Sequence, residues 1–370
     1  MEKLVFRKFI YDTLTFFTIG TLSLSLIVWV IQAVNYLDFV SEDGHSFKVY
    51  FLYTLLNFPK IFSRLFIFMF FISIFYTISR YQEKNELIIF WTNGIKKKDF
   101  VNFIIKSSFI LVLIQLILNL FIVPTTQDKA RSYIRSSNID YFPSLIKSKK
   151  FINTVEDLTM FIDEKNEKGE MTNIFLKDNS NDKSQIISAR KGYLKKDKYN
   201  YYLILEDGNI VDNNKEGSNT ISYNQTKINL SKYSTRTTVD AKIQEQESLL
   251  LFKCIYSLYK LKIEFSENNL ACNKNTVQIV FEEIYKRSIV PIYIIIVSII
   301  SACLVLRSEN DNNFIKFKIV IFSLGIILII LSQALSQYLE DFSPTNIFLG
   351  LFPILLCIFL YYTIQVKIKD

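Results

Sequence analysis

The stretch Thr13–Leu37, which reads TLTFFTIGTLSLSLIVWVIQAVNYL, contains 25 residues and no charged side chain. A helix of about 20 apolar residues is long enough to cross the roughly 30 Å hydrocarbon core of a membrane. A second stretch, Val49–Ser79, is apolar except for Lys60 and Arg64. Four more charge-free stretches reach a comparable length: Ser107–Gln127, Ser288–Leu306, Ile319–Leu339 and Phe342–Val366. The sequence therefore predicts six membrane-spanning helices, three before and three after a polar block.

The composition excludes most catalytic chemistry for this chain. Only 9 of the 370 residues are Gly, and their spacing permits neither the G-x-x-x-x-G-K-[ST] phosphate loop nor G-x-G-x-x-G. The single His, His45, cannot form a His-Glu-x-x-His zinc site and leaves little for a Ser-His-Asp triad. We therefore expect no enzymatic activity, no metal site and no cofactor bound by this chain. The formal charge of +8 comes from basic residues that are scattered or lie beside apolar runs, which indicates membrane flanks and not nucleic acid.

The distribution of Lys and Arg predicts the orientation of the six spans. Short loops rich in Lys and Arg stay on the cytoplasmic side of a membrane. With the amino terminus inside, the inner segments hold fourteen Lys and Arg, whereas the short outer ones hold only Lys48, Lys60 and Arg64. Both termini are therefore expected in the cytoplasm, and the first span is expected to be a retained helix, not a cleaved signal peptide. The polar block then lies outside the inner membrane, in the periplasm of a Gram-negative cell.

The polar block, residues 128–270, has the pattern of an all-β domain inserted between the helical regions 1–127 and 271–370. Short strand-like runs are separated by Asn, Asp, Lys and Gly, and Glu206–Asn209 is typical of a turn. The runs are Leu158–Asp163, Met171–Lys177, Gln185–Ala189, Gly192–Leu194, Tyr199–Leu205, Thr220–Ser222 and Thr226–Leu230. This spacing predicts an antiparallel sandwich or a jelly-roll-like roll. Beyond Asp240 the periodicity becomes helical, at Ser248–Lys260 and Thr276–Tyr285.

Two features of this block have more than one interpretation. In a closed roll the large side chains fill the core, whereas an open roll could hold acyl chains between its sheets. The side chains concerned are Phe161, Phe175, Tyr199, Tyr201 and Leu203. Cys254 and Cys272 lie in polar sequence and could form a disulfide in an oxidising compartment. Cys303 and Cys357 lie in apolar runs and are expected to be buried thiols.

The connection between spans two and three contains a short amphipathic helix, residues 85–94. It runs from Asn85 to Asn93, with Asn85 as its N-cap, Glu86 beside its N-terminal dipole and Gly94 as its C′ residue. One interpretation is an interfacial helix that Trp91 and the following lysines anchor to the membrane. The other is a helix that docks on a cytoplasmic partner.

Two pairs of charged residues lie near the outer ends of the spans. Lys60 and Arg64 are four residues apart and share one helical face. They either snorkel to the headgroup region or bind an anionic lipid headgroup. Glu283 and Arg287 can pair at the helix surface, where such a pair contributes about 0.2–0.5 kcal/mol. Pro291, just beyond them, is expected to kink span four.

Taken together, these features resemble the LptF/LptG (YjgP/YjgQ) family of lipopolysaccharide export permeases, and the resemblance covers nearly the whole chain. The sharpest match is Glu86-Leu87 with Gly94-Ile95, which looks like the family's E-L-x-x-h-x-x-x-G-h coupling helix. Residues 283–291 resemble the E-h-x-x-R-x-x-x-P motif before span four. The chain departs from the family where a proline common early in span two is replaced near residue 66. Between the two paralogues, residues 29–32 favour LptF over LptG.

The resemblance implies a permease subunit of an ATP-driven exporter that extracts lipopolysaccharide from the inner membrane and passes it to a periplasmic bridge. It implies three protein partners: a paralogous six-span permease (LptG or LptF), an LptB-like ATPase homodimer that binds ATP and Mg, and an LptC-like single-span bridge protein. The implied ATPase-coupling residues are Glu86, Leu87, Phe90, Trp91 and Gly94. Lys60 and Arg64 would contact the lipid headgroup, and residues 283, 287 and 291 would be structural. The alternative is a membrane receptor or scaffold with a ligand-binding outer domain, which the short cytoplasmic segments argue against.

Overall fold

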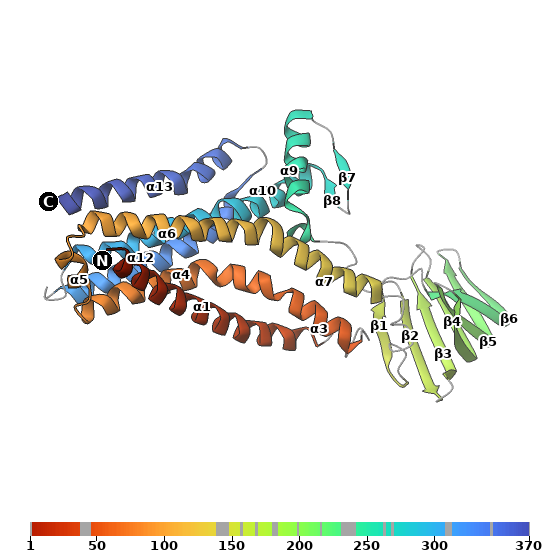
Figure 1. Ribbon diagram of the computed structural model, residues 1–370. Helices are drawn as coiled ribbons and strands as arrows, with labels where there is room; N and C mark the ends of the chain where they lie inside the picture. Colours follow the sequence, from red (N-terminus) through yellow and green to blue (C-terminus); the bar gives the residue numbers. More distant parts are fainter. Residues whose placement is uncertain are drawn as a thin grey trace. The chain divides into compact units, whose positions relative to one another are not determined.

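The computed structural model describes residues 2–37, 46–137, 148–155, 158–166, 169–179, 184–197, 200–214, 217–230, 242–261, 264–267, 270–307, 313–340 and 343–369 (Figure 1). Of the residues named above, His45, Tyr199, Asp240 and Phe342 lie outside these ranges, and so does the side chain of Tyr201. The chain divides into two compact units. The first comprises Met1–Val30, Asn57–Asp128 and Ala241–Asp370, and the second comprises Ile31–Leu56 and Lys129–Asp240.

Six helical segments of the described chain are long and apolar enough to cross a membrane, which confirms the predicted number. They run over Lys3–Asn35, Phe47–Glu83, Lys97–Ile134, Thr276–Leu306, Phe314–Tyr338 and Pro344–Ile368. Each coincides with one of the predicted stretches. Most extend beyond the charge-free run, because the backbone hydrogen bonds of a helix continue into polar sequence at the membrane surface.

Several spans consist of more than one helical element. The elements are α1 (Glu2–Asn35), α3 (Phe47–Leu56), α4 (Phe58–Glu83), α6 (Lys97–Ile117), a π-helical segment (Leu118–Ile122), α7 (Val123–Ser137), α10 (Lys274–Ser288), α11 (Tyr293–Ala302), α12 (Phe314–Ala334) and α13 (Pro344–Lys369). The predicted kink of span four is confirmed, since α10 and α11 are separated by the 3-10 segment Val290–Ile292. Its cause is Pro291, which lacks the N–H that would continue the helix.

Span four is the centre of the helical unit. α11 packs against α4, α6, α12 and α13, and 72% of the apolar window of its span is buried within the chain. The hydroxyls of Ser108 in α6 and Ser298 in α11 lie 3.1 Å apart in this core. By contrast, only 17%, 17% and 11% of the apolar windows of spans one, five and six are buried. These three spans present apolar surface of the kind that contacts lipid or another membrane subunit.

The second unit contains one antiparallel sheet whose strands follow each other in order, as a meander. The strands are β1 (Phe151–Val155), β2 (Leu158–Lys165), β3 (Glu170–Asp178), β4 (Ser184–Asp197), β5 (Asn200–Asn214) and β6 (Gly217–Asn229). The described members of its buried core come from these strands and from Leu230. The sheet therefore curls over its own apolar face (Figure 1). The prediction of an all-β domain inserted between the helices is confirmed by this six-stranded antiparallel sheet.

Asn173 and Asp207 explain why part of this sheet was predicted wrongly. The predicted turn at Glu206–Asn209 is wrong, because these residues continue β5 with the same register on both sides. Asp207 and Asn173 have φ values of 51° and 50°, and both lie opposite residue 190 of β4. A single left-handed residue reverses the inward–outward alternation of a strand. As a result, the predicted strands on either side of these aligned positions belong to longer strands. Gln185–Ala189 and Gly192–Leu194, for example, are both part of β4.

The alternation also decides which predicted side chains fill the core. Leu203 is fully buried there, as predicted. Phe161 and Phe175 are cross-strand partners that lie only half-buried on the opposite face, so their assignment to the core is wrong. Met160 and Ile162, the neighbours of Phe161, face the core in its place. Successive side chains of a strand point to opposite faces, and the aromatic residues fall on the outer one.

The first unit also contains a small element that follows the sheet and precedes span four in the sequence. It consists of α9 (Ser248–Tyr256), a π-helical segment (Ser257–Leu261) and the hairpin of β7 (Phe265–Glu267) and β8 (Leu270–Cys272). α9 and α10 confirm the helices predicted at 248–260 and 276–285. The prediction placed residues 242–270 with the β domain, but α9 packs on α10 through a core that includes Leu251, Cys254 and Val280.

Candidate functional site

A short helix, α5 (Leu87–Thr92), connects α4 and α6 at the end of the bundle that carries the N-terminus (Figure 1). Its C-terminus is as predicted, because Gly94 is the C′ residue with φ of 81°. The amide of Gly94 donates to Trp91 O at 3.0 Å, and the amide of Ile95 donates to Phe90 O at 3.1 Å, which is a Schellman motif. The predicted N-cap is wrong. Asn85 has φ of 56°, and Glu86 occupies the N-cap position without a side-chain cap.

The two faces of α5 differ in exposure. Leu87 and Phe90 are buried in the core of this chain, and Trp91 is half-buried. Ile88 and Ile89 point outward and are 52% and 50% exposed. Leu87 and Phe90 are two of the five residues to which the resemblance assigns the coupling role, and that role stays a prediction. A helical wheel of residues 87–92 separates the two faces, but it does not say which of them packs against the rest of this chain and which is exposed.

The buried face of α5 is held by an aromatic cluster from three elements. The ring of Phe90 lies 5.6 Å from Phe6 and 6.3 Å from Phe9 in α1, and 5.1 Å from Phe100 in α6. Trp91 lies 6.0 Å from the same Phe100 ring. Aromatic pairs at these distances stabilise by about 0.5–1.5 kcal/mol each beyond burial. α5 is therefore fixed against the ends of spans one and three.

The end of α4 beside α5 is also tied to spans four and five. The side-chain amide of Gln82 donates to Leu304 O at 2.8 Å and to Arg307 O at 3.1 Å, at the end of span four. Glu83 forms a 2.6 Å ion pair with Lys318 in α12. These contacts join the ends of several spans into one block around α5.

At the other end of the bundle, α4, α6, α10 and α12 surround a polar cavity of about 510 Å³. Its lining includes four cationic side chains, Lys60, Arg64, Lys286 and Arg287, and one carboxylate, Glu283. The prediction that Lys60 and Arg64 share one face is confirmed, since both line this cavity. Arg64 is exposed and makes no ion pair or hydrogen bond within the described part of the chain.

The cavity also contains uncharged polar groups that sequence reasoning missed. The ammonium of Lys60 donates to Gln244 Oε1 at 3.3 Å. With the side-chain amide of Gln127 turned so that its oxygen faces Lys60, the same ammonium also donates to that oxygen at 2.8 Å. Deeper in the bundle, the Gln115 amide donates to Ser63 O at 2.9 Å. The sequence shows these polar residues within apolar helices, but it does not show that they meet in one cavity, because that depends on how the helices pack.

Glu283 and Arg287 lie beside the cavity, but not at the surface as predicted. The guanidinium Nε donates to Glu283 Oε1 at 2.8 Å, and the Arg287 side chain is only 4% exposed. Its other nitrogens donate to Gln244 O at 3.0 Å, Gln246 O at 2.9 Å and Ser248 Oγ at 2.8 Å. Arg287 therefore holds the segment that leads from the β domain into α9.

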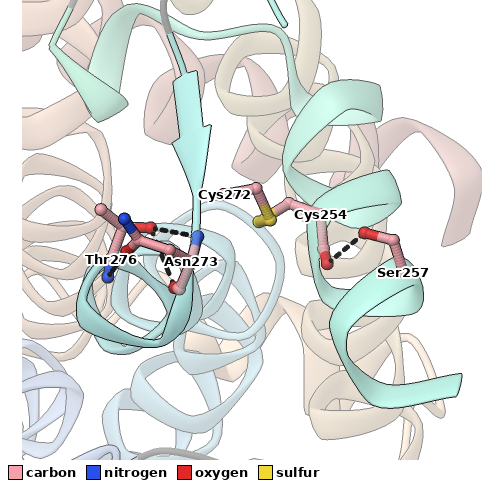
Figure 2. The surroundings of a disulfide bond; sticks show 5 residues. All are labelled: Cys254, Ser257, Cys272, Asn273 and Thr276. Atoms are coloured by element: carbon pink, nitrogen blue, oxygen red, sulfur yellow. Dashed lines mark hydrogen bonds between the residues drawn. A yellow bond between two sulfur atoms is a disulfide. The ribbon is translucent and has the colours of Figure 1, made fainter. Parts of the chain in front are cut away.

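Cys254 and Cys272 form a disulfide between α9 and the end of β8 (Figure 2). The next residue, Asn273, is the N-cap of α10 and accepts a hydrogen bond from the Thr276 amide at 3.0 Å. The disulfide thus joins α9 to the start of span four. The two remaining cysteines, Cys303 and Cys357, are half-buried thiols.

These elements define a class of protein: a six-span membrane protein in which an all-β domain separates three spans from three. The model of the family described as "Lipopolysaccharide export system permease LptF/LptG" matches residues 7–365. The chain belongs to this family, which confirms the resemblance seen in its motifs. The preference for LptF over LptG stays a prediction.

The chain is also similar to a curated protein, "Uncharacterized protein RP871" of Rickettsia prowazekii (strain Madrid E). The two are 25% identical over 193 residues, which are 52% of this chain and 53% of that protein. The chain therefore spans about half the length of the curated relative it matches.

Proposed function

We propose that this chain is a permease subunit of an ATP-driven exporter that extracts lipopolysaccharide from the inner membrane and passes it to a periplasmic bridge. The observation that carries the proposal is the construction of α5. One face is locked into the aromatic cluster at the ends of spans one and three, and the other presents Ile88 and Ile89 to the outside. An exposed apolar face on a rigidly held helix is suited to docking on a separate subunit.

The proposed mechanism follows from the contacts of α5. An ATPase that binds Ile88 and Ile89 and moves on ATP binding would displace α5 as a rigid element. The aromatic cluster transmits this displacement to α1 and α6, and the bonds of Gln82 and Glu83 transmit it to spans four and five. Packed interfaces of this kind shift as units, because close-packed cores do not deform continuously. ATP and Mg would be bound by the ATPase homodimer and not by this chain.

The cavity at the other end of the bundle is the proposed contact for the lipid headgroup. Lys60 and Arg64 present cations to the same space, and Arg and Lys both favour phosphate. Lys286 and Arg287 are paired with Glu282 and Glu283, at 3.0 and 2.8 Å, so they are already neutralised in part. Lys60 and Arg64 are then the cations of this cavity that remain available to an anionic ligand.

The disulfide supports the proposed orientation. Disulfides persist in oxidising compartments such as the periplasm and are rare in the cytoplasm. The Cys254–Cys272 bond therefore favours an outer location for α9, in agreement with the excess of Lys and Arg in the segments expected inside. We propose that both termini are cytoplasmic and that the β domain is periplasmic, where it would receive acyl chains and pass them on.

The proposed assembly has three further protein partners. Spans one, five and six leave most of their apolar windows unburied, which suits a paralogous six-span permease that faces this chain across a shared cavity. The ATPase homodimer would dock on one α5 from each permease, and a single-span bridge protein would continue the periplasmic path.

Replacing Glu86 with Lys tests the function. Glu86 is half-buried and directly precedes α5, whose exposed residues Ile88 and Ile89 form the proposed docking face. Reversing its charge should uncouple export without preventing membrane insertion. Lipopolysaccharide extraction would be measured in vesicles that contain the purified complex and ATP. The matched control is Asp99→Lys, which reverses an exposed charge in the first turn of α6. Normal extraction by Glu86→Lys, with the same amount of inserted protein, would refute the proposal.

A further inference from the structure

The helix α9 has an exposed apolar face that the proposed export mechanism does not use. Leu249, Phe252, Tyr256 and Tyr259 follow each other at steps of three and four residues, the spacing of one helical face. Their exposed fractions are 74%, 44%, 53% and 72%. We call these four residues the α9 face. Lys253 and Lys260 flank it, and the Lys260 ammonium lies 5.4 Å from the centre of the Tyr256 ring.

The opposite side of α9 is fully packed, so the exposure of the α9 face is not caused by a loose helix. Leu250, Leu251 and Cys254 are buried in a core shared with α10. Cys254 is also bonded to Cys272 in β8 (Figure 2). Both faces of α9 are therefore apolar, and the described chain covers only one of them.

The start of α9 is pinned to the ends of the spans. Ser248 Oγ donates to Leu120 O, in the third span, at 2.6 Å. Arg287, at the end of α10, donates to the same Ser248 hydroxyl and to the carbonyl of Gln246. The residue after Leu120 is Phe121, which is 58% exposed on the apolar surface of span three. The α9 face thus begins beside the exposed apolar surface of span three.

The direction of α9 fits a helix in the membrane plane. Figure 1 shows that α9 runs across the direction of the spans and projects sideways from the bundle, and Figure 2 shows that β8 leads directly into the start of α10. The packed side of α9, which includes Cys254, faces α10 and β8. The α9 face is on the opposite side of the helix, so it is turned away from α10, to the outside of the helical unit.

We propose that α9 and its continuation to Leu261 lie in the membrane–water interface, on the side of the membrane that carries the β domain, with the α9 face inserted among the lipids. Interfacial helices of this kind bury an apolar face about 5–10 Å into the boundary between headgroups and acyl chains. Tyr and Lys suit that depth, because the apolar part of each side chain lies in the lipid and its polar end reaches the headgroups. The inference rests on the six spans and not on the export function.

Depth-dependent fluorescence quenching tests this placement. In the full chain with Trp29→Phe and Trp91→Phe, the change Phe252→Trp introduces a single indole on the α9 face. The protein is reconstituted in vesicles of zwitterionic and anionic phospholipids that carry bromine either near the top or near the end of the acyl chain. We expect blue-shifted emission and a loss of intensity that is greater with bromine near the headgroup. Tyr256→Trp in the same background is the second variant.

Two controls give the quenching expected for an indole in the middle of the membrane and for an indole in water. Phe359→Trp, at an exposed position in the middle of span six, should lose more intensity with bromine near the end of the acyl chain. Tyr193→Trp, on strand β4, should lose none with either lipid and should be quenched by acrylamide in the water. The proposal is overturned if the indole at position 252 behaves like the one at 193. It is also overturned if that indole becomes protected only when a second protein chain is added.

Discussion

Replacing Arg287 with Gln should loosen the whole segment that leads into α9. The guanidinium is 4% exposed, pairs with Glu283 at 2.8 Å, and donates to three acceptors between residues 244 and 248. Removing one partner of a buried ion pair costs about 3–5 kcal/mol, because the other charge is left uncompensated. A loss of about 3 kcal/mol in local stability corresponds to amide exchange faster by about a hundredfold.

The chain provides a matched control on the same helix. Lys286 pairs with Glu282 at 3.0 Å with the same spacing, but the two side chains are 36% and 25% exposed. Lys286→Gln should therefore cost no more than about 1 kcal/mol. Hydrogen–deuterium exchange of the purified full chain, followed by mass spectrometry of peptides from residues 242–261, compares the two variants.

A further variant separates the lost charge pair from the lost hydrogen bonds. Adding Glu283→Gln to Arg287→Gln removes the uncompensated carboxylate, so the double variant should recover part of the protection. The reasoning is refuted if Arg287→Gln exchanges no faster than Lys286→Gln, since burial of the pair would then have no energetic consequence.

Three further predictions follow from individual contacts. Gly94→Ala has room for its Cβ but must keep φ near 81°, so the Schellman end of α5 should weaken by about 1 kcal/mol, seen as faster amide exchange in residues 87–95. Cys254→Ser should cost about 3 kcal/mol, because the disulfide closes a loop of 18 residues, and wild type should show the same loss of thermal stability in reductant. Burial raises the pKa of Tyr223, whose hydroxyl donates to Ser188 O at 2.9 Å. The protonated Tyr223 side chain therefore stabilises the β domain fully below the unfolded pKa of about 10, and this contribution is lost as the pH rises through the folded pKa. Tyr223→Phe should remove this pH-dependent loss of stability, which is measured as the rate at which a protease cleaves the β domain.

The membrane architecture could be predicted from the sequence because it depends on local composition. A charge-free run such as Thr13–Leu37 spans a membrane whatever it packs against. Gly94 was predicted for the same reason, since a C′ residue with positive φ favours glycine in any context. These features require no knowledge of distant parts of the chain.

The features that sequence patterns missed or predicted wrongly depend on contacts between distant residues. The surface pairing expected for Arg287 overlooked acceptors some forty positions earlier, at residues 244–248. The direction of α5 depends on Phe6 and Phe100, so the motif identified the helix but not its exposed residues, Ile88 and Ile89. Asp207 reads as a turn because Asp-Gly is typical of one, yet paired neighbours on both sides keep it in a strand.

The most direct test of the central claim is to tag this chain, extract it in mild detergent and identify the proteins that co-purify with it. We predict a P-loop ATPase and a second six-span permease with the wild-type chain. With Ile89→Asp, which places a charge on the exposed face of α5, the ATPase should be lost while the second permease is retained. Recovery of the wild-type chain alone, or as a homodimer without an ATPase, would contradict the account, and so would an ATPase that binds the Ile89→Asp chain equally well.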